Sequence, residues 1–308
     1  MKSIYHCNYK FYRSDLKPQK FLAISDIHFV DKINKDHQRA LSFIKQEAPD
    51  YILISGDTID NIHVAESPDA VKLLREFFTK LGQIAPVCLC LGNHDSFRRI
   101  KPFRPKGSWH KINYISEKSS PLKNLIGDIP NIHLLENESY EDDSICVFGF
   151  SLPADYYENA EHPGLEKKEV LLNELDRLKD KITNLPNKKP RILLAHSPFY
   201  FADTDVKERL SEFDFILTGH THNGVVPPVL QEIWRGRRGI LSPHKRILSR
   251  QIARIGLYKN QLIVLGAVTT IAASGLLDSA FPTNVATIEI INDKFKKPRI
   301  KRHYKKAS

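Results

Sequence analysis

The sequence predicts an α/β fold, because short apolar runs typical of buried strands alternate along the chain with amphipathic stretches typical of helices. The chain has 308 residues, of which 41% are hydrophobic and 27% charged, a composition that excludes wholesale disorder. This length fits two domains or one large α/β domain. Five of the apolar runs end in turns rich in Asp, Asn and His, and they cover residues 20–25, 51–55, 87–91, 191–195 and 213–218.

Three amphipathic segments between these runs predict helices that pack on a sheet. The first spans about residues 36–46. The second begins at Ser67, the predicted N-cap, with Pro68 in the first turn, and ends at Gly82. The third carries leucines on one face over residues 171–182 and ends before Pro186. We interpret each apolar face as core packing.

The four cysteines are too few for a disulfide framework in a chain of this size, and we expect all of them to be reduced. The first fifteen residues lack the apolar core of a signal peptide. The longest apolar run, 262–277, is shorter than the roughly 20 residues of a bilayer helix and contains two glycines. It predicts a strand and a loop of a second sheet. Together these features predict a cytoplasmic protein.

Positive charge is concentrated in three segments. Residues 96–111 carry six basic residues and 233–259 carry eight, with no acid in either, and 293–308 carry eight against Asp293. Because the whole chain has a net charge of +10, the remainder is acidic. Such segments attract anionic partners, although a solvated basic tail is the plainer interpretation of 293–308. We place the clearest boundary there, with a domain over 1–292 and a basic tail over 293–308.

The turns after the five apolar runs predict a metal site. Asp26-x-His28 and His220-x-His222 place two side chains two positions apart, so that both can point the same way at a strand end. In α/β sheets, ligands gather beyond the carboxyl ends of the strands, where five such turns can converge. Carboxylate, imidazole and amide groups without thiolate suit Mn, Fe or Zn. One such pair would be weak evidence, but five of the thirteen histidines fall in these turns.

The turns, taken in order, resemble the motifs of the calcineurin-like metallophosphoesterase family. The matching residues are Asp26-x-His28, Gly56-Asp57-x-x-Asp60, Gly92-Asn93-His94-Asp95, His196 and Gly219-His220-x-His222. The resemblance covers roughly residues 20–225. It implies a four-layer α/β/β/α sandwich with two divalent metal ions at the strand ends. It also implies a phosphoric ester hydrolase in which a hydroxide that bridges the metals attacks phosphorus.

The resemblance also implies a ligand set. One ion would be held by Asp26, His28, Asp57 and His222. The other would be held by Asp57, Asn93, His196 and His220, with Asp57 bridging the two.

Two further residues of these motifs are assigned to catalysis. His94 matches the family's histidine beside the metals, and we expect it to stabilise the transition state or to protonate the leaving oxygen. We expect Asp60 to hydrogen-bond behind His94 and set its tautomer, although a helix-cap role for Asp60 is an alternative. Asp95 is assigned no catalytic role.

The basic segment after His94 is the best indication of the substrate. Arg98 and Arg99 are the expected contacts of an anionic, phosphate-containing substrate, and the alternative is a basic surface loop. Residues 225–259 combine apolar and basic stretches, as peripheral proteins on anionic membranes do. Members of the family with a similar region act on lipid-linked phosphates, but they have two glycines after His-x-His, where this chain has Asn223-Gly224. We therefore hold contact with the inner membrane surface as a hypothesis.

The leading functional prediction is a dinuclear phosphohydrolase that cleaves a phosphodiester or a phosphoanhydride. One alternative is a nuclease acting on single-stranded nucleic acid, because aromatic residues are interleaved with the basic ones. No recognisable nucleic-acid-binding module argues for it. An alternative of another class is a non-catalytic scaffold on the same fold, but such a protein should lack some of the ligands, and here every expected position is filled. The sequence leaves the oligomeric state open.

Overall fold

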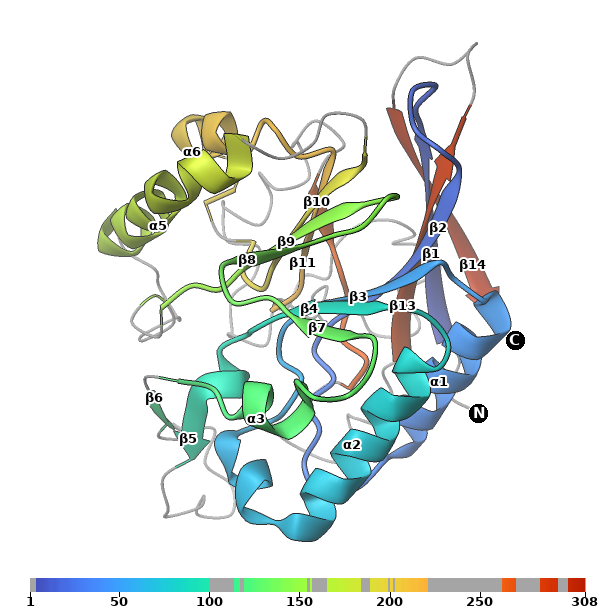
Figure 1. Cartoon of the computed structure of the whole chain (residues 1–308), viewed down its shortest axis with the longest axis vertical. Helices are drawn as coiled ribbons and strands as arrows, with labels where there is room; N and C mark the ends of the chain where they lie inside the picture. Colours follow the sequence, from blue (N-terminus) through green and yellow to red (C-terminus); the bar gives the residue numbers. More distant parts are fainter. Residues whose placement is uncertain are drawn as a thin grey trace.

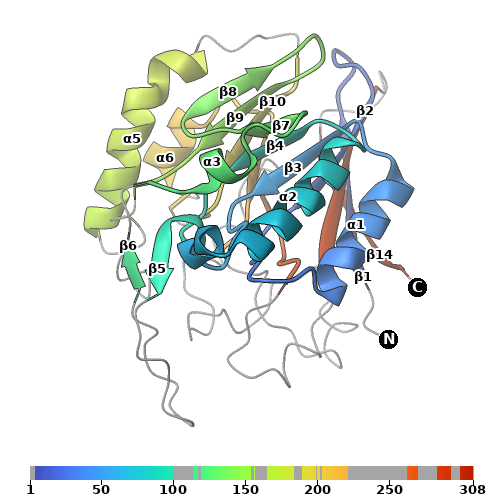
Figure 2. The same cartoon turned by 60° about the horizontal axis from the view of Figure 1, so that its bottom comes forward.

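The computed structural model has two stacked β-sheets, each covered by helices on its outer face (Figure 1). It describes residues 4–99, 114–116, 119–153, 156, 165–183, 189–198, 200–201, 203–220, 262–269, 283–292 and 299–307. Successive layers run from α5 through the two sheets to α1 and α2 (Figure 2). This arrangement confirms the predicted α/β/β/α sandwich.

The larger sheet has seven strands in the order β14-β1-β13-β2-β3-β4-β7. In that order the strands span Arg299–Ala307, Ile4–Tyr12, Thr283–Ile291, Gln19–Ile24, Tyr51–Ser55, Val87–Cys90 and Ile132–Leu134. The strands β2, β3, β4 and β7 are parallel to one another. Their carboxyl ends therefore lie along one edge of the sheet.

The smaller sheet has five strands in the order β12-β11-β10-β9-β8. In that order they span Leu262–Val264, Phe215–Thr218, Arg191–Ala195, Cys146–Phe150 and Glu138–Glu141. All neighbours are parallel except β8 and β9. β12 confirms a strand at the start of the apolar run 262–277. A separate two-stranded ribbon joins β5 (Phe97–Arg99) and β6 (Tyr114–Ser116).

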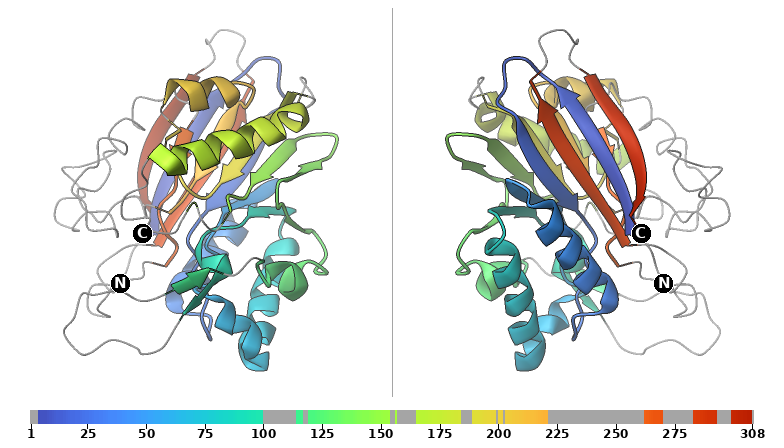
Figure 3. Two further views of the ribbon diagram at one scale, coloured as in Figure 1. Left: turned by 90° about the vertical axis from the view of Figure 1, so that its left-hand side faces the viewer. Right: turned by 90° about the vertical axis from the view of Figure 1, so that its right-hand side faces the viewer.

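The helices cover the outer faces of the two sheets from opposite sides (Figure 3). α1 (Lys35–Glu47), α2 (Pro68–Gly82) and the short α3 (Leu122–Ile126) pack on the larger sheet. α5 (Leu165–Thr183) and α6 (Thr204–Arg209) pack on the smaller one. α2 begins as predicted, because the Ser67 side chain accepts a hydrogen bond from the Ala70 N–H and Pro68 occupies the first turn.

A third apolar layer lies between the two sheets and joins them. It contains Phe21 and Leu53 from the larger sheet and Leu194, Phe215 and Leu217 from the smaller one, all fully buried. Burial of each such side chain contributes about 1.5–3 kcal/mol. This shared core fixes the ends of the strands of both sheets relative to one another. The four cysteines are free and buried, as predicted.

The segment with the basic C-terminal charge forms β14, which pairs antiparallel with β1 from Arg299 opposite Tyr12 to Ala307 opposite Ile4. Most of the segment that the charge pattern sets apart as a tail is therefore an edge strand of the larger sheet. Among the described residues, no helix is long and apolar enough to cross a bilayer. The basic stretch 225–259 lies outside the described residues.

Candidate metal centre

The polar turns after β2, β3, β4, β10 and β11 meet at one place, as the sequence predicts. Backbone hydrogen bonds connect the first two turns, from Asp26 N to Gly56 O over 3.1 Å and from His28 N to Asp57 O over 3.0 Å. In the smaller sheet, Gly219 N donates to His196 O over 2.9 Å. These bonds fix neighbouring turns within each sheet.

Two contacts with backbone groups connect the turns of one sheet to those of the other. His196 Nδ1 lies 2.8 Å from the backbone carbonyl of Ser55, at the end of β3. The backbone N–H of His220 lies 3.2 Å from both carboxylate oxygens of Asp26. The predicted ligands of both sheets therefore share one buried space.

Asp57 occupies the centre of this space and is 1% exposed. Its Oδ2 lies 3.1 Å from His196 Nε2 on one side and 3.7 Å from His28 Nε2 on the other. Its Oδ1 accepts a hydrogen bond from the backbone N–H of His94 over 2.8 Å. The Asp57 carboxylate thus lies near His196 on one side, called the first side below, and near His28 on the other, called the second side.

On the first side, four predicted ligands have their donor atoms close together. His196 Nε2 is 3.1 Å from Asn93 Oδ1 and 3.2 Å from His220 Nδ1. Because the Ser55 carbonyl can only accept, His196 Nδ1 carries a proton, and in the neutral ring Nε2 presents a lone pair. Two ligands about 2.1 Å from one metal ion lie roughly 3–3.4 Å apart, so the donor atoms fit a shared cation.

On the second side, one ligand atom each from His28, Asp57 and His94 lies within 4.8 Å of the others. His28 Nε2 is 3.9 Å from Asp26 Oδ1. On the first side, ligand atoms of Asp57, His196 and His220 also lie within 4.8 Å of one another. Asp57 therefore belongs to two groups of residues that are each able to hold a metal ion.

The electrostatics of the centre favour bound positive charge. Burial raises the pKa of Asp57, but the neighbouring His196, His94 and His28 outweigh burial and hold that pKa well below its usual value. Burial lowers the pKa of His196, but the Asp57 and Asp26 carboxylates and the hydrogen bond to the Ser55 carbonyl together outweigh burial and raise it to about 9. The centre thus stabilises a cation beside Asp57, and a divalent ion would take the place of the histidine's second proton.

Four of the predicted ligands have a backbone conformation that non-glycine residues rarely adopt. The φ angles of Asp26, His28, Asp57 and His220 are 54°, 48°, 52° and 64°. Such left-handed residues cost free energy and cluster at functional sites. Here they occur in the sharp turns that bring the ligands together at the ends of β2, β3 and β11.

A close approach of two turns explains why glycine precedes Asn93. A Cβ atom at Gly92 would lie 2.2 Å from Asp57 Oδ1 and 2.4 Å from Asp57 N. No side chain fits there without separating the turns that follow β3 and β4.

The hydrogen bond behind His94 comes from the main chain of Asp60. His94 Nδ1 lies 2.7 Å from the Asp60 carbonyl oxygen, whereas the Asp60 carboxylate is 3.8 Å from the same nitrogen. The expected partner is therefore correct, but its contact is the backbone oxygen and not the side chain. The carbonyl fixes a proton on Nδ1, which leaves Nε2 as the nitrogen for chemistry.

The predicted substrate-binding arginines begin the ribbon that follows His94. Arg98 Nη1 donates to Glu66 Oε1 over 2.7 Å, and His63 Nδ1 is 2.7 Å from the other oxygen of that carboxylate. Nothing in the sequence pattern indicated that Glu66 holds Arg98. The backbone of Arg99 lies in β5, but its side chain is outside the described part of the chain, as is all of His222.

A family model decides the classification, because the model of the calcineurin-like phosphoesterases matches residues 19–224. The chain belongs to the calcineurin-like phosphoesterase family. It is thereby classed as a metallophosphoesterase. The match contains all five polar turns.

Among similar proteins, an uncharacterized metallophosphoesterase of Aquifex aeolicus is 25% identical over 74% of this chain and 75% of its own length. An uncharacterized metallophosphoesterase of Campylobacter jejuni is 24% identical over 70% of this chain, which spans 46% of that protein. A solved dimetal phosphatase from Danio rerio is 14% identical, with a TM-score of 0.41, and the match covers 81% of this chain and 88% of that one.

Proposed function

We propose that this protein is a metal-dependent phosphohydrolase that uses two divalent ions to cleave a phosphodiester or a phosphoanhydride. The observation that carries the proposal is the position of Asp57, whose carboxylate lies between His28 at 3.7 Å and His196 at 3.1 Å. A carboxylate shared by two ions is the arrangement that two-metal hydrolysis requires.

The two sides of Asp57 would hold one ion each. Asn93, His196 and His220 would complete the site on the first side. Asp26 and His28 would complete the site on the second side, with His222 predicted beside them. The bound pair, whether Mn, Fe or Zn, would activate water and neutralise charge that develops on the phosphoryl oxygens.

His94 would act on the leaving group. The Asp60 carbonyl accepts a hydrogen bond from His94 Nδ1 over 2.7 Å and so orients the ring. Nε2 of the protonated ring is then able to donate to the leaving oxygen or to a charged oxygen of the transition state. The His94 side chain is 17% exposed, so it is within reach of a substrate that enters from solvent.

We propose that the substrate carries negative charge in addition to that of the phosphate group that reacts. Arg98 extends from β5, directly after the turn with His94, and its guanidinium can pair with phosphate oxygens in place of Glu66. A cytoplasmic location and contact of the basic stretch 225–259 with an anionic membrane surface are further proposals, which rest on the sequence alone.

The proposal is tested by assaying the purified protein with Mn²⁺ against a generic phosphodiester, a phosphomonoester, a nucleoside diphosphate adduct and single-stranded DNA. We expect turnover of the diester or of the anhydride and loss of that turnover in Asp57→Asn. Asp143→Asn is the matched control, because Asp143 is exposed and precedes β9, at the opposite end of the smaller sheet.

Preferential cleavage of DNA, with a steep dependence on salt, would favour the nuclease alternative. A folded, metal-loaded protein that turns over none of these compounds would refute the proposal. So would an Asp57→Asn variant as active as Asp143→Asn.

A further inference from the structure

Asp95 is a buried carboxylate to which the proposed function gives no task. It is 0% exposed and lies in the short 3-10 turn His94–Ser96, two residues after Asn93. Its Oδ1 accepts a hydrogen bond from the backbone N–H of Ile59 over 2.9 Å. Its Oδ2 accepts one from the backbone N–H of Gly92 over 2.8 Å.

The bond from Ile59 connects the two turns that hold the central ligands, and the bond from Gly92 closes the turn that follows β4. Ile59 lies two residues after Asp57, in the turn that follows β3, and Gly92 directly precedes Asn93, in the turn that follows β4. A hydrogen bond in the opposite direction runs from the backbone N–H of His94 to Asp57 Oδ1 over 2.8 Å. Each turn therefore supplies a carboxylate that accepts from the backbone of the other.

We propose that Asp95 is a positioning residue that holds Asn93 at the correct distance from Asp57 and so sets the affinity for the ion that these two residues would share. The inference rests on the proposed function. Asp95 itself does not touch the ion or the substrate. It acts through the backbone on which both ligands are carried.

The chemistry of the contact explains why a carboxylate stands at this position. Two backbone N–H groups from separate turns each need an acceptor, and an ionised carboxylate has two acceptor oxygens. An asparagine of the same shape has one oxygen and one NH₂ group, which would face an N–H donor. One of the two turns would then lose its hydrogen bond in a site that excludes water.

The two sides of Asp57 should respond differently to this loss. Asn93 belongs to the group with His196 and His220, whereas Asp26 and His28 belong to the other. Asp26 and His28 are held by separate backbone bonds to Gly56 and Asp57. Loosening the turn that follows β4 should therefore weaken one ion and spare the other.

The test is a Mn²⁺ titration by equilibrium dialysis on the full-length wild type, on Asp95→Asn and on Asp214→Asn. Asp214 is a matched control, because it is a buried carboxylate that accepts from the Arg191 backbone N–H over 2.9 Å and from the Arg13 guanidinium. Arg191 and Asp214 lie at the opposite ends of β10 and β11 from the metal centre.

We expect the wild type and Asp214→Asn to bind two ions with the same affinities. Asp95→Asn should bind one ion normally and the other about 10- to 100-fold more weakly, the usual effect of losing a residue that supports a ligand. Low-temperature electron paramagnetic resonance at limiting Mn²⁺ should then show the pattern of isolated ions and not of coupled pairs. Two ions bound by Asp95→Asn with wild-type affinity would overturn the inference, and so would equal weakening of both.

A wild type that binds fewer than two ions would count against the proposed function itself. A wild type that binds two ions, with the same affinities in Asp95→Asn, would count against this inference alone. Hydrogen exchange of the wild-type amides tests the contact even if Asp95→Asn does not fold. We expect the amides of Ile59 and Gly92 to exchange slowly. Rapid exchange of either amide would overturn the inference.

Discussion

The close approach of two turns at Gly92 makes Gly92→Ala the sharpest test of the site's geometry. The added Cβ would lie 2.4 Å from the backbone nitrogen of Asp57, whereas ordinary contacts of a Cβ begin at about 3.4 Å. Because the Asp57 nitrogen is a backbone atom and cannot rotate away as a side chain can, the turns after β3 and β4 must separate by about 1 Å. A displacement of that size at a reacting centre costs about 100-fold in rate, or about 2.7 kcal/mol of transition-state stabilisation.

The assay compares kcat/KM on a generic diester, Mn²⁺ affinity and the urea midpoint of Gly92→Ala with those of Gly82→Ala. Gly82 is the last residue of α2, where a Cβ would lie 2.6 Å from the Pro130 carbonyl oxygen. Both variants should lose about 1–3 kcal/mol of stability through overpacking, but only Gly92→Ala should lose activity. Wild-type kcat/KM in Gly92→Ala, or an equal loss in both variants, would refute the reasoning.

Three further predictions concern single side chains. His94→Asn should lower kcat by about 10²- to 10⁴-fold while the protein keeps its metal ions, and metal loss measured by mass spectrometry would contradict this. Arg98→Ala should raise KM by about 10-fold through loss of a charged hydrogen bond, and an unchanged KM would remove Arg98 from the substrate site. Burial raises the pKa of Asp142, but two tyrosine hydroxyls and two backbone N–H groups outweigh it and lower that pKa. The stability that Asp142 contributes is therefore present above its unfolded pKa and is lost as pH falls through the lower folded value. Urea unfolding of Asp142→Asn should accordingly depend less on pH below about pH 5 than unfolding of the wild type does. An equally steep dependence in the variant would refute that assignment.

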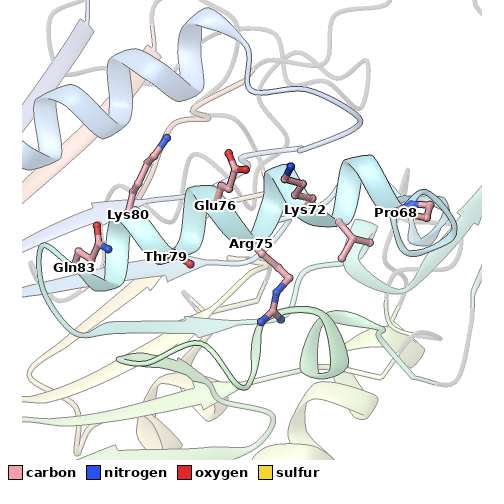
Figure 4. A pocket seen from close by; sticks show the side chains of 8 residues that line it. Pro68, Lys72, Arg75, Glu76, Thr79, Lys80 and Gln83 are labelled. Carbon is pink, nitrogen blue, oxygen red and sulfur yellow. The ribbon is translucent and has the colours of Figure 1, made fainter.

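A pocket of about 680 Å³ along α2 offers a useful contrast to the metal centre (Figure 4). The described residues that line it come from α2, including Lys72, Arg75 and Glu76, and from its C-cap Gln83, and none of them belongs to the polar turns. Substitutions along this helix face, such as Lys72→Ala, should leave metal binding unchanged.

The sequence predicts the strands, the helices and the meeting of the polar turns because these depend on local patterns, whereas the four layers are what the family resemblance implies. Each of the five apolar runs is a buried strand, and parallel strands place their carboxyl ends together. Ser67, Pro68 and Gly82 mark the ends of α2 for reasons that act within one turn of the chain. Composition alone also predicts the four reduced cysteines.

Other features depend on partners that lie far away in the sequence. β14 carries strong positive charge, and its strand pairing is set by β1 at the other end of the chain. Asp95 accepts from Ile59, which lies 36 residues earlier, and the motif alone does not show this contact. The sequence likewise names Asp60 as the partner of His94 but does not show that the backbone oxygen makes the hydrogen bond.

The central claim, that Asp57 lies between two bound cations, is tested most directly by anomalous X-ray diffraction from crystals grown with Mn²⁺. We expect two anomalous peaks per chain, one on the His28 side of the Asp57 carboxylate and one on the His196 side. A single peak, or two peaks of which neither touches Asp57, would contradict the account.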